Sequence, residues 1–220
     1  MLGPLGRGAY GAGADAFLLC VPDAGIAAAA AAIPPGRPVG HCSGATGLDA
    51  LAPHEAFSLH PLMTVTSAGA SFRGAGAAVD GSTSEALTLA EELATALGME
   101  PIRVRDHDRA AYHAAASIAS NFLVTLEAAA ERLAATVGLE REALVPLVRA
   151  TVENWASLGP EGALTGPVAR GDDATVEAQR AAVLERAPEL TDLFDALVAL
   201  TRSVARASGQ SQTIQEPQLA

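Results

Sequence analysis

The chain has 220 residues, half of them hydrophobic and only 4% aromatic, so it can bury a core built from Ala, Leu and Val. Its formal net charge is −11 at pH 7, which argues against nucleic acids and anionic membranes as main partners. All 14 basic residues are arginine. The composition therefore excludes a P-loop lysine, a Schiff-base lysine and a lysine general acid.

The N-terminal stretch GRGAYG (6–11) matches the spacing of the dinucleotide-binding glycine motif. That motif binds a pyrophosphate only where a strand runs into it and a helix leaves it. Only five residues precede this stretch, and a strand pattern follows it. We therefore interpret it as a glycine-rich lead-in whose match to the motif is a coincidence.

The first half of the chain alternates strand and helix signals, which is typical of an α/β sheet. A helix is expected after Ser82, which can form a capping box with Glu85, and Gly98 ends it. An alanine-rich helix is expected over 23–33. Strands are predicted over 14–22, 38–44, 56–61, 77–81 and 100–106.

From residue 107 the pattern becomes helical, with apolar residues at helical spacing as far as Gly138. Further helices are predicted over about 140–157, 172–186 and 188–207, and Pro146 is expected to kink the first of them. We predict three segments: an α/β domain over 1–105, an all-helical domain over 106–207 and a polar, disordered tail over 208–220.

The two cysteines, Cys20 and Cys42, lie in apolar strand-like runs and are predicted to be small buried hydrophobic residues in a reducing compartment. The sequence shows neither a CxxC pair nor a zinc-ligand spacing. The longest apolar run is interrupted by Asp and Pro residues and is too short to span a membrane. We expect a cytoplasmic protein without a metal site.

Polar residues follow three of the predicted strands. In open α/β sheets ligands bind at the carboxyl ends of strands, which favours a ligand role for Val21-Pro22-Asp23 and for the turn 41–47. Asp23 could equally cap the next helix, and the turn could be purely structural, so both interpretations stay open. His60 ends the strand 56–61 at the edge it shares with Ser43 and Asp23, which favours a functional histidine.

A polar stripe is predicted on the long helix, where His113, Ser117, Asn121 and Thr125 recur at intervals of four. Small uncharged polar groups suit either a ligand pocket or a hydrogen-bonded seam between domains. These groups and the strand ends could serve hydride transfer to a carbonyl, with His60 as proton donor or acceptor. They could also bind a polar ligand without catalysis.

Several stretches together resemble one family: LLCVPD, VGHCSGATGLDAL, FSLHPLMTV, DRAAYHAAASIASNFLVTLEAAAERLA and LVRATVENWASLGPEGALTGPVARGD. The chain resembles, over about residues 3–206, the Rossmann-like oxidoreductases that end in domain of unknown function 2520. These belong to the 6-phosphogluconate-dehydrogenase-like superfamily, with ketopantoate reductase, pyrroline-5-carboxylate reductase and prephenate dehydrogenase as relatives. The resemblance implies an NADP-binding Rossmann-like sheet followed by an all-α C-terminal domain.

The resemblance also implies that the chain lacks the first strand, the glycine loop and its helix, and hence carries a truncated Rossmann-like sheet. It implies a cofactor site for NADP, or alternatively NAD, from Val21, Pro22 and Asp23 beside the nicotinamide ribose. Ser43 and Gly44 extend that site toward the substrate. An arginine past the second strand can meet the 2′-phosphate, which assigns that role to Arg7.

For catalysis, the resemblance implies that His60 is the acid/base histidine and that Ser43 and Asn121 orient the substrate. Asn121 matches the asparagine of a Lys-x-x-x-Asn helix signature, and Ser117 stands where the lysine would be. This departure shifts the expected proton transfer to His60 and His113. The resemblance further implies a homodimer formed through the helical domain, acting on a small carbonyl, imine or alcohol. The alternative function is a non-catalytic ligand-binding or structural dimer.

Overall fold

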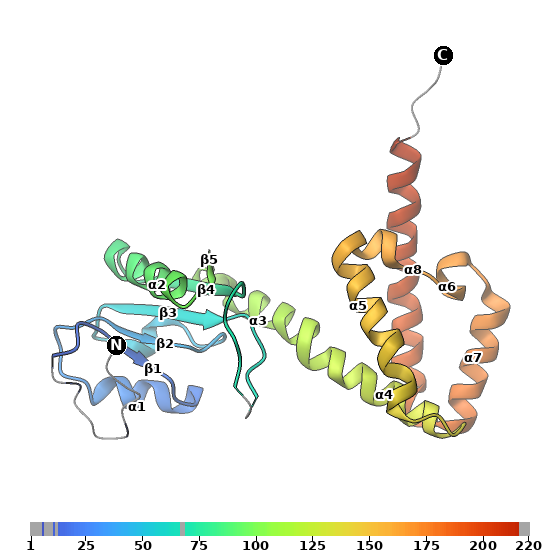
Figure 1. The fold of residues 1–220 in the computed structure, drawn as a ribbon, viewed down its shortest axis with the longest axis horizontal. Helices are drawn as coiled ribbons and strands as arrows, with labels where there is room; N and C mark the ends of the chain where they lie inside the picture. The colour runs from blue at the N-terminus through green and yellow to red at the C-terminus, as the bar shows by residue number, and fades with distance from the viewer. Residues whose placement is uncertain (1–5, 7–10, 12, 67–68, 216–220) are drawn as a thin grey trace, which may run out of the picture. The chain divides into compact units, whose positions relative to one another are not determined.

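The sheet of the N-terminal part carries the residues that concern function. A computed structural model describes Gly6, Gly11 and residues 13–66 and 69–215, with the backbone alone over 208–215. The chain folds into two compact units, Met1–Leu123 and Val124–Ala220 (Figure 1). The domain boundary predicted at residue 105 precedes the long helical segment, whereas the two units divide inside it.

The first unit contains a five-stranded sheet in the order β1-β2-β3-β4-β5, in which β3 and β4 are antiparallel and the other neighbours are parallel. This arrangement confirms the predicted α/β N-terminal part of Rossmann-like type. The elements are β1 (Phe17–Leu19), η1 (Asp23–Gly25), α1 (Ile26–Ala31), β2 (Val39–His41), η2 (Leu48–Leu51), β3 (Ala56–Pro61), β4 (Gly76–Gly81), α2 (Ser84–Ala96), β5 (Glu100–Arg103), η3 (Asp106–Asp108), α3 (Arg109–Ser117) and η4 (Ile118–Phe122).

Strand β3 lies in the middle of the sheet and its side chains alternate between the two faces. Phe57 and Leu59 are fully buried in the cluster under α2, whereas Ala56 is buried in the cluster under α1. By the same alternation, Ser58 and His60 lie on the face of Ala56. The two helices cover opposite faces of the sheet (Figure 1), which explains why residues 56–59 of β3 are buried on both faces.

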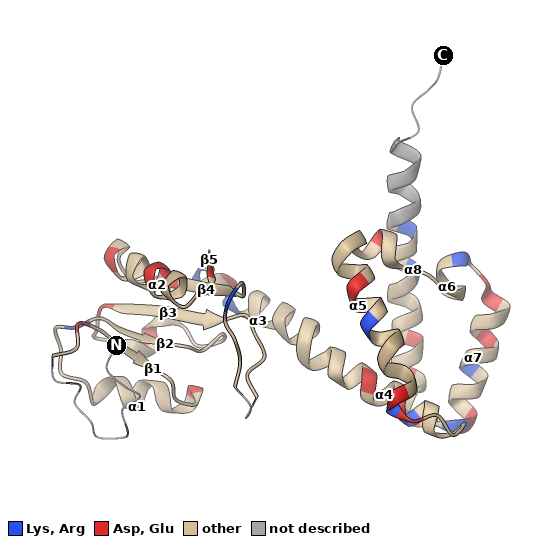
Figure 2. Cartoon of the chain, in the orientation of Figure 1, with Lys and Arg blue, Asp and Glu red and all other residues tan. Residues whose placement is uncertain are grey.

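Because β1, β2 and β3 are parallel, their carboxyl ends meet at one edge of the sheet. The three predicted polar stretches follow these ends, so the prediction that they share an edge is correct. Strands β1, β2 and β3 contain no Asp, Glu, Lys or Arg (Figure 2). The carboxylates and the guanidinium of this edge therefore come from the loops and from η3 and α3, whereas the strands contribute uncharged polar groups such as Ser58 and the histidines His41 and His60.

The start of α2 differs from the prediction. Thr83, not Ser82, is the N-cap, and its Oγ1 accepts the backbone N–H of Ala86 at 3.1 Å. The Ser82 hydroxyl instead accepts the N–H of Ala56 at 2.8 Å, which ties the helix start to the beginning of β3. The predicted capping box is therefore wrong because its serine has another partner. The predicted end is confirmed, since Gly98 has a φ of 80° just past the helix.

The second unit is all-helical, as predicted. Its elements are α4 (Leu123–Ala135), α5 (Arg141–Ala163), α6 (Pro167–Arg170), α7 (Asp173–Arg186), η5 (Pro188–Leu190) and α8 (Thr191–Gln215). Helix α5 departs from helical angles at Gly159, which has a φ of 70°, and not at the predicted Pro146. The reason is that the φ of proline stays compatible with a helix, whereas glycine can adopt the left-handed region.

The C-terminal helix α8 continues to Gln215, through most of the segment predicted as a disordered tail, and residues 216–220 lie outside the described part. That segment has no proline before Pro217, so nothing in its backbone forbids a helix. Among the described residues, none of the helices combines the length and the apolar composition that crossing a bilayer requires.

Candidate functional site

His41 holds the turn that follows β2. Its side chain is fully buried, and its Nδ1 accepts the N–H of Ser43 at 3.2 Å. The proton therefore resides on Nε2, which donates to the Gly47 carbonyl at 3.3 Å. Burial lowers the pKa of His41, so the ring is neutral at pH 7. This histidine uses both nitrogens to shape the turn.

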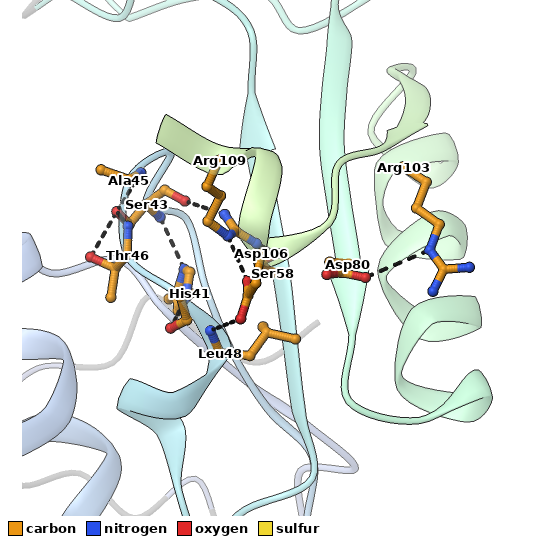
Figure 3. Close-up of polar contacts among 11 residues, drawn as sticks. His41, Ser43, Ala45, Thr46, Leu48, Ser58, Asp80, Arg103, Asp106 and Arg109 are labelled. Carbon is orange, nitrogen blue, oxygen red and sulfur yellow. Dashed lines mark hydrogen bonds and ion pairs between the residues drawn. The ribbon is translucent and has the colours of Figure 1, made fainter. Parts of the chain in front are cut away.

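The hydroxyl of Ser43 joins the ends of β1 and β2. It donates to Asp23 Oδ2 at 2.7 Å. It also accepts the N–H of Thr46 at 2.9 Å and of Ala45 at 3.2 Å (Figure 3). Asp23 opens η1 without a side-chain cap, so of the two interpretations left open for it, helix capping is not observed, and its carboxylate accepts the hydrogen bond of Ser43 instead. Ser43 thus organises the turn, and its oxygen is already engaged by neighbouring groups of the chain.

Arg109, at the start of α3, is the buried cation of this edge. Its Nε donates to Asp106 Oδ1 at 2.9 Å, and its two terminal nitrogens donate to the Ser43 carbonyl and to the Ser58 hydroxyl (Figure 3). Only 3% of Arg109 is exposed. The residue therefore connects the β2 turn, β3 and η3.

Asp106 completes this network by accepting the N–H of Leu48 at 3.0 Å. Burial acts to raise the pKa of Asp106, but the hydrogen bonds from Arg109 and Leu48 outweigh it and hold the pKa below its usual range. Sequence reasoning missed both Asp106 and Arg109. The available signal was the i,i+3 spacing of an acid and a base at the start of a long helix.

His60, the predicted catalytic residue, lies beside the two aromatic residues at the start of α3. Its Nδ1 is 2.7 Å from the Tyr112 hydroxyl, and its ring is edge-on to those of Tyr112 and His113, with centroids 5.6 Å and 6.1 Å away. Gly44 also lies against the ring. The structure thus brings together three of the predicted residues, His60, His113 and Gly44, and adds Tyr112.

The environment of His60 favours the neutral imidazole. Burial lowers the pKa of His60 below its ordinary value of 6.5, and the nearby His113 and Arg109 lower it further, while Asp23 opposes the shift. The ring is half-buried. At pH 7 the residue can therefore accept a proton, and it becomes a donor only below its lowered pKa.

Gly44 is the position where a side chain would disturb His60 most directly. A Cβ built there would lie 2.8 Å from His113 Cδ2 and 2.9 Å from His60 Nε2. We predict that Gly44→Ala displaces both rings and shifts the His60 pKa, measured by NMR titration of the imidazole signals. The matched control is Gly36→Ala, where no atom lies within 4 Å, although its φ of 100° costs some stability. An unchanged His60 titration in Gly44→Ala would contradict this packing.

Ser117 and Asn121 lie further along the same helical segment, Ser117 half-buried and Asn121 exposed. Residues 118–122 form a π-helical turn. In an α-helix, a side chain four residues further along is turned by about 40° around the helix axis relative to the first. A π turn has more residues per turn, so the same step of four residues turns the side chain in the opposite direction. The π turn therefore keeps His113, Ser117 and Asn121 closer to one stripe than a plain α-helix would.

The remaining predicted residues fall at or beyond the edge of the first unit. Val21 and Pro22 are exposed directly after β1. Arg7 lies outside the described residues. The two cysteines are not buried as predicted, since Cys20 is exposed and Cys42 half-buried. They lie one residue past the ends of β1 and β2.

No group of three or more His, Cys, Asp and Glu side chains within the described ranges gathers as metal ligands. A hollow of about 410 Å³ lies in the second unit. Among its lining residues, Arg202 pairs with Asp173 at 2.6 Å. None of the predicted site residues that the structure describes lines this hollow.

The helical unit and the end of the sheet match a known family. Residues 75–201 match the model of domain of unknown function 2520. The comparison with curated proteins gave no significant match. A protein of Thermotoga maritima of known structure is 29% identical, with a TM-score of 0.77, and the match covers 86% of this chain and 78% of that one.

Two further solved structures share the fold at lower identity. A proposed NADP oxidoreductase of Bacteroides fragilis is 20% identical, with a TM-score of 0.74, over 86% of this chain and 76% of that one. The 1-pyrroline-5-carboxylate reductase of Streptococcus pyogenes is 15% identical, with a TM-score of 0.55, over 88% and 76%. At these identities the similarity shows a common fold.

Proposed function

The chain belongs to the family defined by domain of unknown function 2520, and from this premise we propose that it acts as an NADP-dependent oxidoreductase on a small carbonyl or imine, or on the matching alcohol or amine. The observation that carries the proposal is His60, a half-buried neutral imidazole at the carboxyl end of β3, held by Tyr112. The structures with the same fold include a proposed NADP oxidoreductase and a reductase that is named for an imine.

The described residues fit the nicotinamide end of a dinucleotide. Val21 and Pro22 expose an apolar edge directly after a parallel strand, and Asp23 adds a carboxylate that can accept a hydrogen bond from a ribose hydroxyl. In the proposal these three residues hold that end of NADP, and Arg7 meets the 2′-phosphate. When bound, the cofactor supplies the hydride.

In the proposed reaction His60 handles the proton. Its neutral ring accepts the hydroxyl proton of an alcohol as the substrate is oxidised, and its protonated ring returns one to the oxygen or nitrogen during reduction. Tyr112 orients the ring through Nδ1, which leaves Nε2 for the substrate. His113 lowers the pKa of His60 and so favours the accepting form at neutral pH. Asn121 would orient the substrate.

One observation favours the second candidate function, a ligand-binding or structural dimer without catalysis. The Ser43 hydroxyl, expected to touch the substrate, is engaged by Asp23 and by the turn 43–46. A serine hydroxyl with these partners stabilises the turn and does not need a substrate as its partner. His60 separates the two functions, since only the enzyme needs its proton transfer.

The proposal is tested by assaying oxidation or reduction of the nicotinamide with a panel of small carbonyls, cyclic imines and hydroxy acids. Because the pKa of His60 is lowered, we expect oxidation to rise with pH through a midpoint below 6.5 and reduction to fall through the same midpoint. The measurement is kcat/KM against pH in both directions. A shared midpoint well above 6.5 would contradict the assignment of His60.

We further propose a homodimer formed through the helical unit. Helix α5 has no buried residue in this unit, and it exposes Leu147, Val152, Trp155 and Leu158. Large exposed apolar side chains on one helix mark a protein interface. Static light scattering of the purified protein is expected to give twice the mass of 22.2 kDa.

The matched variants for the dimer are Trp155→Asp, expected to give a folded monomer, and Glu153→Ala on the same helix, expected to remain a dimer. A monomeric wild-type chain, or a dimer that Trp155→Asp leaves intact, would contradict an interface at α5.

A further inference from the structure

Two sulfur atoms meet at the edge of the sheet that carries the proposed site. Strands β1 and β2 are parallel with Leu19 opposite His41, so the next residues, Cys20 and Cys42, also face each other. Their Sγ atoms are 3.8 Å apart, and both thiols are free. A disulfide has an S–S distance of about 2.05 Å. The pair is thus within a small rearrangement of a bond.

The two thiols differ in access and in acidity. Cys20 is exposed and Cys42 is half-buried. A hydrogen bond from the Cys42 thiol lowers the pKa of Cys20 to about 6, against the opposing effect of burial. The same contact, together with burial, raises the pKa of Cys42. Of the two thiols, Cys20 is therefore the more accessible and the more acidic, and it is the one expected to react as a thiolate.

We propose that Cys20 and Cys42 form a redox-active dithiol site, in which Cys20 attacks a low-molecular-weight disulfide and Cys42 resolves the product into an intramolecular disulfide. The proposal does not depend on the oxidoreductase function. It assigns the pair a chemistry that differs from that of the small buried hydrophobic residues predicted for these positions.

The reaction balances with the small disulfide as oxidant. The Cys20 thiolate attacks one sulfur of the small disulfide, so that a mixed disulfide forms and one small thiolate leaves. Cys42 then gives up its proton and attacks Cys20 Sγ, which releases the second small thiol. Two protein thiols are oxidised to one disulfide, and one small disulfide is reduced to two thiols.

A disulfide between Cys20 and Cys42 would affect the proposed cofactor site because both cysteines directly precede residues of that site. Cys20 immediately precedes Val21-Pro22-Asp23, and Cys42 immediately precedes Ser43, whose hydroxyl already binds Asp23. A disulfide between them would fix the two loops to each other next to that hydrogen bond. The loops that the proposal assigns to the nicotinamide would then be covalently joined.

The test exposes the purified, reduced protein to oxidised glutathione and follows its intact mass. We expect the loss of two hydrogens and no lasting adduct. Cleavage on the amino side of aspartate separates Cys20 (in 15–22) from Cys42 (in 23–48), so the bridged peptides should appear joined before reduction and separate after it. An unchanged mass, or two separate glutathione adducts, would overturn the proposal.

Single variants test which thiol attacks. Cys42→Ser is expected to accumulate a glutathione adduct on Cys20, since no thiol resolves it, whereas Cys20→Ser is expected to stay largely unmodified over the same time. Circular dichroism checks that both variants fold. Equal rates of adduct formation in the two variants would overturn the assigned order, and the intact-mass experiment on the unaltered protein does not depend on either variant.

The hydrogen bond between the thiols can be tested separately, through the pH dependence of Cys20 alkylation. In the unaltered protein the alkylation of Cys20 should reach half its maximal rate near pH 6. Cys42→Ala removes the donor and should move this midpoint upward, while Cys42→Ser keeps an O–H donor and should leave it closer to the original. If the midpoint of the alkylation rate were unchanged in Cys42→Ala, Cys42 would not lower the pKa of Cys20.

Discussion

Replacing His60 by Ala is expected to lower kcat by about 10²–10⁴-fold, the usual contribution of a positioned acid/base, and to leave NADPH binding nearly unchanged. The reason is that His60 contacts Tyr112 and the Gly44 turn, and in the proposal it moves the substrate proton. The measurement combines steady-state kinetics with a fluorescence titration of NADPH. A loss of cofactor binding equal to the loss of kcat would point to a structural role.

The matched control for His60 is His107→Ala. The side chain of His107 is 70% exposed, and its Nε2 lies 3.2 Å from Oδ2 of the neighbouring Asp108. Its removal should leave kcat within about twofold, because an exposed pair of this kind contributes little. A comparable loss of activity in both variants would show that the effect does not come from the site.

Replacing Arg109 by Leu is expected to cost about 1–3 kcal/mol of the free energy of unfolding, the range for leaving buried polar groups without their hydrogen-bond donor. The variant leaves the buried Ser43 carbonyl and the buried Ser58 hydroxyl without their donor, and it removes the partner of the half-exposed Asp106. Urea denaturation, followed by circular dichroism, measures the change.

Arg132→Leu serves as the control for Arg109. The side chain of Arg132 is 65% exposed, and its Nε lies 3.1 Å from Oε1 of Glu189, which is 47% exposed. Surface pairs of this kind contribute about 0–1 kcal/mol, so the free energy of unfolding of this variant should stay close to that of the unaltered protein. If Arg109→Leu unfolded at the same urea concentration as Arg132→Leu, the buried network would not hold the edge of the sheet together.

Local pattern was sufficient to predict much of the fold. The run 56–61 is the strand β3 with the same bounds, and the parallel order of β1 to β3 gathers the polar stretches at one edge. These features depend on alternation and on turn residues, which the sequence displays directly. His60 could be chosen as a site residue for the same reason, since its strand ends at that edge.

Features that depend on tertiary partners could not be predicted in this way. Ser82 was expected to cap a helix, but its hydroxyl binds the start of β3, 26 residues earlier in the chain. Arg109 is buried only because Asp106, Ser43 and Ser58 converge on it from three elements. The facing of Cys20 and Cys42 depends on strand register, which the sequence of either strand alone does not specify.

The most direct test of the central claim is a titration of the 220-residue protein with NADPH and with NADH, following the fluorescence of the reduced nicotinamide. The account predicts saturable binding of NADPH in the micromolar range, an ordinary range for an enzyme ligand, and weaker binding of NADH. A chain that circular dichroism shows to be folded, but that binds neither nucleotide, would contradict the oxidoreductase function and favour the non-catalytic dimer.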